Sequence, residues 1–230
     1  MNTLRRWEDL PDFMRTPEVR PYYEKLNRKR FSLCLKRIFD VVAASAVLIV
    51  LSPAMIVISV LIFLDSPGKI FYRQERVTSY GKTFRIHKFR TMVENADKMG
   101  PQVSVDSDSR ITRVGKVLRK YRMDEFPQLI DVLKGDMSFV GTRPEVPKYV
   151  KEYTPEMMAT LLMPAGITSK ASIEYKDEAE LLESAENVDE VYVEKVLPGK
   201  MKYNLDSIKH FNCFSDLLTM IETVLAVLKD

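Results

Sequence analysis

The sequence predicts an α+β fold, mostly helical, for a monotopic membrane protein whose membrane helix re-enters one face of the bilayer instead of crossing it. Three observations support this prediction. Residues 41–64 carry no charge, the dipeptide Ser52-Pro53 lies at their centre, and basic residues flank them on both sides. With 230 residues, the chain is long enough for this anchor and one further domain.

The uncharged segment is long enough to reach across a bilayer. A helix of its 24 residues would be about 36 Å long, and the hydrocarbon core of a bilayer is about 30 Å thick. Pro53 removes the N–H that would bond the carbonyl of Ile49, so the helix is expected to kink or break there into two half-bilayer arms. The Ser52 hydroxyl can donate to the carbonyl that the proline leaves free.

The charge on the two flanks favours re-entry over crossing. Basic residues beside a membrane segment favour the cytoplasm, and they cluster both at 28–37 and at 69–90. A spanning helix would place one cluster on the wrong side, whereas a re-entrant helix keeps both on the cytoplasmic side. An ordinary kinked transmembrane helix and a buried core helix are the alternatives.

These signals divide the chain into three parts. We expect an N-terminal interfacial lead-in at 1–38, the re-entrant helix at 39–64, and a cytoplasmic-face domain with amphipathic helices at 65–230. The turn 65–68, Asp-Ser-Pro-Gly, ends the anchor.

A β-hairpin is expected directly after the anchor. Apolar and polar residues alternate in 70–74 and again in 83–89, and Ser79-Tyr80-Gly81 lies between them. The next segment, 97–110, is rich in Ser and Asp and is expected to form a loop.

Helical spacing of apolar residues returns after this loop. It predicts one helix in 111–121 and a second from Asp124 to Gly135, where glycine ends it. The glycine-punctuated stretch 135–144 contains a short apolar strand.

The C-terminal third shows weaker signals. Thr154-Pro155 has the cap-then-proline pattern of a helix start, and 171–175 is compatible with a short strand. In 215–229, apolar residues recur at helical spacing, so this helix either packs into the core or lies flat on the membrane.

Composition indicates which partners and which metal sites suit the chain. The 35 basic and 32 acidic residues give a net charge of +3, and the basic excess before residue 123 suits anionic partners such as lipid headgroups, phosphates or nucleotides. Two cysteines, Cys34 and Cys213, are too few for a disulfide framework or a zinc site. His87 and His210 likewise cannot build a histidine-rich metal centre.

Three Asp-Glu pairs occur in the chain: Asp124-Glu125, Asp177-Glu178 and Asp189-Glu190. The last two lie in acidic, helix-like stretches and are interpreted as solvated faces. The first is followed by Pro127, which fits only the first turn of a helix, so its carboxylates would lie at a helix N-terminus and stay ionised. Nucleophile or metal ligand is one interpretation of Asp124, and helix capping is the other.

Two further motifs carry cations that suit phosphate. Arg143 follows the glycine-punctuated strand and is fixed by Pro144, a setting that favours bidentate phosphate binding. Lys88 and Arg90 flank Phe89 at the end of the expected hairpin, where membrane-surface charge is the alternative interpretation.

Together these motifs resemble the bacterial sugar transferases, the monotopic phosphoglycosyl transferases that begin the assembly of capsule, O-antigen, exopolysaccharide or glycoprotein glycans. The resemblance covers roughly residues 34 to 175 and is carried by four stretches in order: 71–77 (FYRQERV), 88–92 (KFRTM), Arg119 with 124–129 (DEFPQL), and 135–144 (GDMSFVGTRP). In size the chain resembles the small form of the family.

The resemblance implies a reaction and assigns residues to it. Asp124 would attack the β-phosphate of a UDP-sugar, release UMP and form a phosphosugar ester that polyprenyl (undecaprenyl) phosphate then attacks. Glu125 would hold Mg²⁺. The remaining candidate residues would contact or support the phosphates: Arg119, Arg143, Lys88 and Arg90.

The resemblance also implies a re-entrant helix broken at Ser52-Pro53, and a place at the cytoplasmic face of the bacterial inner membrane. Expected partners are the UDP-sugar, the polyprenyl phosphate and inner-membrane lipids, with no nucleic acid; a homo-oligomer is left open. A membrane-surface phosphohydrolase of lipid diphosphates and a non-catalytic membrane adaptor are the alternative functions.

Some positions depart from the family pattern. Thr78 stands where glycine is common, and Thr142 and Ala165 stand where proline is common. Ser169 replaces a glycine. These departures leave the acidic pair untouched but put the nucleotide contacts and the choice of sugar in doubt.

Overall fold

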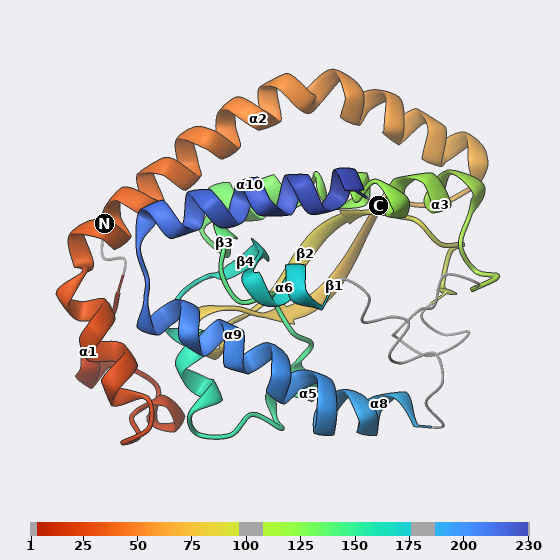
Figure 1. The fold of residues 1–230 in the computed structure, drawn as a ribbon. Coiled ribbons are helices and arrows are strands. Elements are labelled where there is room, and N and C mark those ends of the chain that lie inside the picture. Colours follow the sequence, from red (N-terminus) through yellow and green to blue (C-terminus); the bar gives the residue numbers. More distant parts are fainter. Residues whose placement is uncertain (1–3, 97–107, 176–186, 230) are drawn as a thin grey trace.

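A computed structural model describes residues 4–96, 108–175 and 187–229, and confirms the predicted class: a mostly helical α+β fold (Figure 1). The α-helices are α1 (Arg20–Arg28), α2 (Arg30–Asp65), α3 (Arg113–Lys120), α4 (Gln128–Lys134), α5 (Pro147–Val150), α6 (Lys170–Glu174), α8 (Val188–Val191), α9 (Leu197–Lys209) and α10 (Cys213–Lys229). The strands are β1 (Phe71–Val77), β2 (Thr83–Phe89), β3 (Met137–Val140) and β4 (Ala165–Thr168).

Short 3₁₀ turns and one π-helical turn connect these elements. The 3₁₀ turns are η1 (Trp7–Asp9), η2 (Asp12–Met14), η3 (Ser79–Gly81), η5 (Met123–Glu125) and η6 (Met157–Leu162). The π-helical turn η7 (Tyr192–Val196) leads directly into α9. The predicted loop at 97–110 lies outside the described residues over 97–107.

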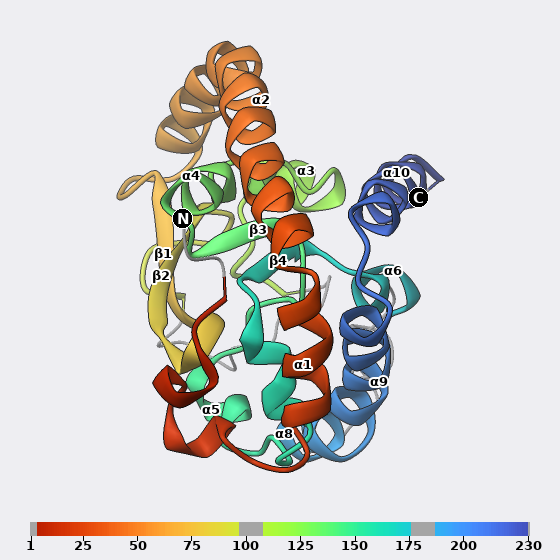
Figure 2. The same cartoon turned by 90° about the vertical axis from the view of Figure 1, so that its left-hand side faces the viewer.

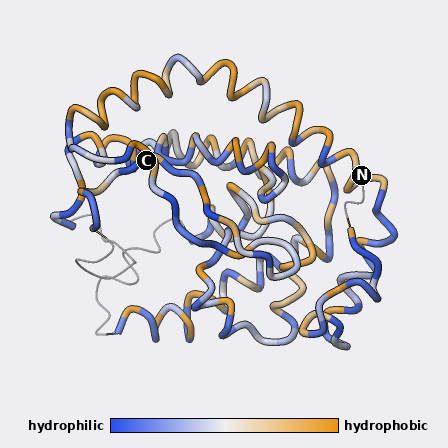
Figure 3. The backbone as a smooth tube through the Cα atoms, turned by 180° about the vertical axis from the view of Figure 1, so that it is seen from behind, coloured by the Kyte–Doolittle hydropathy of each residue, from blue (hydrophilic) through white to orange (hydrophobic). Residues whose placement is uncertain are grey.

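Helix α2 arches over the rest of the molecule (Figure 1). It is long and apolar enough to cross a membrane by length and composition, and 11% of its apolar 18-residue window is buried. The buried residues of α2 fall into two groups, at 33–44 and at 58–62, and Ser52-Pro53 lies exposed between them. The alternative of a buried core helix is therefore wrong. Figure 3 shows hydrophobic residues along most of the arch.

The expected break at Ser52-Pro53 is wrong in its detail, because α2 is continuous from Arg30 to Asp65. The Ser52 hydroxyl donates to the carbonyl of Ile49 at 2.8 Å, so the predicted acceptor is satisfied within the helix. The helix also begins nine residues before the predicted start at residue 39. The helix therefore continues through the proline and does not unwind there.

The predicted β-hairpin is confirmed. β1 and β2 pair antiparallel with Phe71 opposite Phe89 and Val77 opposite Thr83. Tyr80 and Gly81 in the connecting turn have positive φ angles of 60° and 72°, which is why glycine is favoured at this tip. Phe84 and Ile86 of β2 pack against Leu129 of α4 in one hydrophobic cluster.

A second, parallel pair of strands brings two distant segments together. β3 confirms the strand expected within 135–144, and it pairs with β4 through Met137 and Ala165. The strand expected at 171–175 is wrong, because residues 170–174 form α6, capped by the Ser169 hydroxyl. The pairing partner of β3 therefore lies directly before the predicted segment.

The N-terminal segment packs into the largest hydrophobic cluster. Its buried members include Leu4, Met14 and Leu26, which share the cluster with Leu162 and Met201. Figure 2 shows α1 beside α9 at the end of the molecule away from the α2 arch. The division of the chain at residues 38 and 64 stays a prediction, but residues 4–28 contribute directly to the core.

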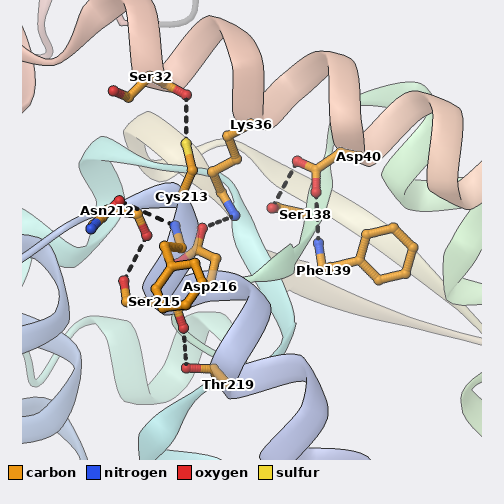
Figure 4. A network of polar contacts seen from close by, with 11 residues as sticks. Ser32, Lys36, Asp40, Ser138, Phe139, Asn212, Cys213, Ser215, Asp216 and Thr219 are labelled. Carbon is orange, nitrogen blue, oxygen red and sulfur yellow. Dashed lines mark hydrogen bonds and ion pairs between the residues drawn. The ribbon is translucent and has the colours of Figure 1, made fainter.

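Buried polar contacts fix α2 to α10 and to β3 (Figure 4). Lys36 of α2 pairs with Asp216 of α10 at 2.7 Å. Asp40, one turn further along α2, accepts hydrogen bonds from the Ser138 hydroxyl at 2.8 Å and the Phe139 N–H at 3.3 Å. These contacts hold the start of the arch against α10 and β3.

The apolar stripe of α10 faces outward. Its described members are between 44% and 58% exposed: Leu217, Leu218, Ile221, Val224 and Leu225. Packing of this stripe into the core of this chain is therefore wrong. The membrane-surface alternative stays a prediction.

Candidate active site

The acidic pair Asp124-Glu125 lies in η5, the 3₁₀ turn between α3 and α4. A helix beginning at Asp124 is wrong, since α4 begins at Gln128. Pro127 has no N–H to bond the carbonyl of Met123, which instead accepts the Phe126 N–H at 3.3 Å. The carboxylates therefore precede α4, and their electrostatics depend on nearby cations.

Glu125 is held by two of the predicted cations. Its Oε1 contacts Lys88 Nζ at 2.9 Å and Arg143 Nη2 at 2.6 Å, and its side chain is 11% exposed. Burial by itself raises the pKa of Glu125, but the charges and hydrogen bonds of Arg143 and Lys88 outweigh burial and lower this pKa well below its usual value. Glu125 is thus a fixed anion with both cations on one oxygen.

Asp124 has a different environment from its neighbour. Burial raises the pKa of the Asp124 carboxyl above its usual value, and the adjacent Glu125 adds to this effect. The charges of Lys88, Arg143 and Arg119 oppose the rise and favour the carboxylate. Two adjacent acids with pKa values shifted in opposite directions are typical of a site in which each has its own role.

A polar cavity of about 530 Å³ opens beside Asp124. Lys88 and Arg119 lie in its wall, so the structure brings both predicted cations to the nucleophile candidate. Other basic residues line the same cavity: Lys69, Arg73, Arg85, Arg90 and Arg110. This concentration of positive charge suits an anionic ligand that carries several phosphate oxygens.

Arg90 has a second role besides lining the cavity. Its guanidinium donates to the carbonyls of Ser66 and Pro67 in the turn after α2, and the residue is 6% exposed. Its Nε is the one buried side-chain nitrogen or oxygen in the described part of the chain without a hydrogen-bond partner. Arg90 therefore fixes the end of the arch to the hairpin, and its contact with a phosphate stays a prediction.

An apolar cavity of about 400 Å³ lies on the other side of the acidic pair. Glu125, Arg122 and Arg143 are its charged lining residues, while α2 and α10 contribute apolar walls through Leu51 and Val224. The pair thus lies between a basic cavity at Asp124 and an apolar cavity at Glu125. Ser52 and Pro53 lie outside this site, at the middle of the arch.

The carboxylates fit a divalent cation that is shared with a substrate. Within residues 4–96, 108–175 and 187–229, no group of three or more His, Cys, Asp and Glu side chains could hold a metal alone. Mg²⁺ commonly binds one or two carboxylates and completes its coordination with phosphate oxygens and water. Asp124-Glu125 offers two adjacent carboxylates beside the basic cavity, which suits that arrangement.

Two of the departures from the family pattern contact one another. The hydroxyl of Thr78 donates to the carbonyl of Asp136 at 2.6 Å and accepts the N–H of Ala165 at 3.1 Å. A proline at 165 would have no N–H to donate, and a glycine at 78 would have no hydroxyl to receive it. Both residues are buried. The hydroxyl of Thr78 thus satisfies the N–H that alanine, unlike proline, presents at 165. Neither residue lines the polar cavity.

Sequence reasoning missed one polar pair beside this site. His87 of β2 and Asp131 of α4 contact each other through two hydrogen bonds. The signal for Asp131 was a single carboxylate among the inward apolar residues of a predicted helix. His87 directly precedes Lys88, but a lone histidine in a strand carries no further signal.

Comparisons with known proteins agree with the motifs. A model of the family described as bacterial sugar transferase matches residues 31–230. The UDP-N-acetylgalactosamine-undecaprenyl-phosphate N-acetylgalactosaminephosphotransferase of Aeromonas hydrophila is 36% identical over 197 residues, which cover 84% of this chain and 44% of the relative. The exopolysaccharide production protein ExoY of Rhizobium meliloti (strain 1021) is 30% identical over 207 residues, covering 84% of each chain.

A third relative is the UDP-glucose:undecaprenyl-phosphate glucose-1-phosphate transferase of Escherichia coli (strain K12). It is 33% identical over 195 residues, which cover 83% of this chain and 39% of the relative. The chain therefore spans less than half the length of the Aeromonas and Escherichia proteins, and most of the length of ExoY.

Proposed function

Because the chain belongs to the bacterial sugar transferase family, we propose that it moves a sugar 1-phosphate from a UDP-sugar to polyprenyl phosphate, in bacteria undecaprenyl phosphate, and releases UMP. This would be the first membrane step in the synthesis of a capsule, O-antigen, exopolysaccharide or glycoprotein glycan. One observation carries the proposal beyond family membership. The acidic pair lies between a basic cavity and an apolar one, as a reaction between a nucleotide-sugar and a lipid phosphate requires.

The proposed chemistry has two displacements at one phosphorus. A carboxylate oxygen of Asp124 bonds to the β-phosphorus of the UDP-sugar, and the bond from that phosphorus to the bridging oxygen breaks, so UMP leaves with the electron pair. An oxygen of the lipid phosphate then attacks the same phosphorus and breaks its bond to Asp124, which restores the carboxylate. Covalent catalysis of this kind replaces one difficult displacement between two bulky anions by two easier ones.

The cations around the pair would stabilise the charge that moves during these steps. Lys88 and Arg119 share the basic cavity with Asp124 and would contact phosphate oxygens of the substrate. Arg143 contacts Glu125 at 2.6 Å and lines the apolar cavity, where it would meet the phosphate of the lipid. Cations placed before the reaction act on phosphoryl charge without reorganisation.

Glu125, with Asp124 beside it, would hold Mg²⁺ together with the diphosphate. When bound, Mg²⁺ would reduce the repulsion between a carboxylate nucleophile and a diphosphate and favour departure of UMP. The fixed negative charge of Glu125 supports this role because the carboxylate stays ionised at the pH of the cell.

The arch of α2 supports a re-entrant anchor. Both ends of α2 meet the body of the protein (Figure 1), so the arch can enter and leave the bilayer by one face. The exposed Ser52-Pro53 lies near the middle of the helix, which runs from Arg30 to Asp65. The apolar walls from α2 and α10 would then place the apolar cavity at the headgroup level. We propose that this face is the cytoplasmic side of the inner membrane.

The topology can be tested with single cysteines on each side of the arch. In a background with Cys34→Ser and Cys213→Ser, we expect Arg28→Cys and Glu75→Cys to resist a membrane-impermeant maleimide in intact spheroplasts. Both should react once the cells are permeabilised. Labelling of only one of the two from outside would show a spanning helix and overturn the re-entrant proposal.

The activity can be tested with the purified full chain in nanodiscs that contain undecaprenyl phosphate. We expect UMP release from one member of a panel of UDP-sugars, with equal appearance of lipid-linked sugar diphosphate. UMP release should stop on addition of EDTA and return with Mg²⁺.

Other outcomes of this assay identify the alternatives. Release of inorganic phosphate from a lipid diphosphate without any nucleotide-sugar would indicate a phosphohydrolase. No product with any member of the panel would favour the non-catalytic adaptor. UMP release that persists in EDTA would contradict the Mg²⁺ site alone.

A further inference from the structure

We infer that Asp131 and His87 form a clamp that positions Lys88 against Glu125, and this inference rests on the proposed function. Asp131 is 1% exposed, and both of its carboxylate oxygens contact His87. Oδ2 accepts the backbone N–H of His87 at 2.8 Å, and Oδ1 contacts the ring Nδ1 at 2.6 Å. One carboxylate on α4 therefore fixes both the backbone and the side chain of one residue on β2.

The backbone contact is possible because β2 has an open edge. In an antiparallel pair, residues alternate between positions that exchange hydrogen bonds with the partner strand and positions that do not. The bonds from Arg90 to Ile70 and from Thr78 to Lys82 place the even-numbered residues of β1 in hydrogen-bonded pairs. His87 pairs with Arg73, so its N–H points away from β1, toward α4 and Asp131.

The clamp and the active-site ion pair join the same two segments. His87 and Lys88 are neighbours on β2, while Glu125 and Asp131 lie six residues apart at η5 and α4. Lys88 Nζ reaches Glu125 at 2.9 Å. With His87 fixed on one segment and Asp131 on the other, the backbone from which Lys88 extends cannot slide along α4.

Docking of β2 on α4 does not by itself require a buried carboxylate. Phe84 and Ile86 already pack against Leu129 and Val132 in a shared hydrophobic cluster. Apolar packing specifies position less strictly than hydrogen bonds do, and a shift of one residue in a strand turns every side chain to the opposite face. The clamp therefore fixes the position of β2 along α4, and this position decides whether Lys88 faces Glu125.

Neither clamp residue lines the polar or the apolar cavity as the described residues define them. Asp131 and His87 thus act through Lys88 and are positioning residues. The contribution of the clamp to kcat/KM should therefore depend on the presence of Lys88.

A double-mutant cycle tests this dependence. We expect Asp131→Leu and His87→Phe each to lower kcat/KM for UMP release by about 10- to 100-fold, since small misplacements of a catalytic cation are costly. In a Lys88→Met background, the same substitutions should lower kcat/KM by less than about threefold. Asp131→Asn should retain most of the wild-type activity. Its amide oxygen can accept the backbone N–H of His87, and its NH2 group can donate to Nδ1 of the other histidine tautomer.

Val132→Ala is the matched control. Val132 is the fully buried neighbour of Asp131 on α4, so its truncation destabilises the same helix and leaves the clamp in place. We expect a lower Tm and an equal effect on kcat/KM with and without Lys88. Equal fold losses for the Asp131 and His87 variants in both backgrounds would show a purely structural role and overturn the inference.

A second measurement does not depend on activity. Reductive methylation followed by mass spectrometry reports how freely each lysine reacts, and the Lys88 side chain is 21% exposed whereas Lys82 is 65% exposed. We expect Asp131→Leu, or His87→Phe if the former does not fold, to raise methylation of Lys88 relative to Lys82. An unchanged ratio overturns the clamp. If the wild-type chain releases no UMP but the variants still show the expected rise in methylation of Lys88 relative to Lys82, the proposed function is refuted and the clamp is supported.

Discussion

Asp124→Asn is expected to abolish UMP release, with a loss of at least about 10³-fold in kcat, because the amide oxygen is a far weaker nucleophile than a carboxylate. The substitution keeps the size of the side chain and removes a charge that burial already disfavours. We therefore expect the Tm to change little or to rise. The measurement is initial UMP release in nanodiscs together with the thermal unfolding of the same sample.

The chain contains its own control for this experiment. Asp189-Glu190 is also an Asp-Glu pair, but Asp189 is 52% exposed and pairs with Lys148. Asp189→Asn should retain wild-type turnover. Mass spectrometry of wild-type enzyme quenched during reaction with the UDP-sugar should place a phosphosugar adduct on Asp124. Near-normal turnover of Asp124→Asn, or an adduct that maps to another residue, would refute the mechanism.

Arg143→Met is expected to have the second largest effect, a loss of about 10²- to 10³-fold in kcat. The substitution removes a cation that lies 2.6 Å from Glu125 and faces the apolar cavity. It also leaves the buried Glu125 with less compensating charge, which destabilises the fold. Arg143→Lys should recover part of the activity, since it restores the charge without the planar guanidinium.

The same variant predicts a change in pH dependence. The pKa of Glu125 is lowered in the folded protein, so its ionised form stabilises the fold above the usual glutamate pKa. This contribution is lost as the pH falls through the folded pKa. Removing Arg143 leaves burial, which raises the pKa of Glu125, less strongly opposed. We expect the acid-side loss of Tm to be smaller in Arg143→Met than in wild type, because the folded pKa of Glu125 moves closer to its unfolded value.

Arg20→Met is the control for Arg143→Met. Arg20 is 59% exposed and pairs with Glu24 one helical turn away, an arrangement that contributes little to stability. Its kcat and its Tm profile between about pH 4 and 7 should match wild type. An Arg143→Met variant with the wild-type acid limb would show that Arg143 does not govern the ionisation of Glu125.

Elements that depend on neighbouring residues could be predicted from the sequence. The β-hairpin follows from alternating residues around a glycine-containing turn, and the contact of Ser52 with Ile49 follows from the geometry of a helix with one proline. The acidic pair was also visible, because Pro127 and the preceding cations set it apart from the other two Asp-Glu pairs.

Elements that depend on distant residues were missed or placed wrongly. The strand expected at 171–175 is α6, and the true partner of β3 is β4, since parallel pairing joins segments far apart in sequence. The two hydrogen bonds of Arg90 to the turn after α2 span more than twenty residues. Periodicity contains no signal for either contact.

The sequence by itself determined the long apolar helix, the hairpin and the position of the candidate acidic pair, because each depends on the spacing of residues along a short stretch of chain. Only the tertiary structure decided that Lys88 and Arg143 meet on one oxygen of Glu125 and that Asp131 holds the edge of β2. It also decided that Asp124 opens to the basic cavity and Glu125 to the apolar one. The physical reason is that shared anions and cavities arise where separate elements pack, and local propensity does not specify which elements meet.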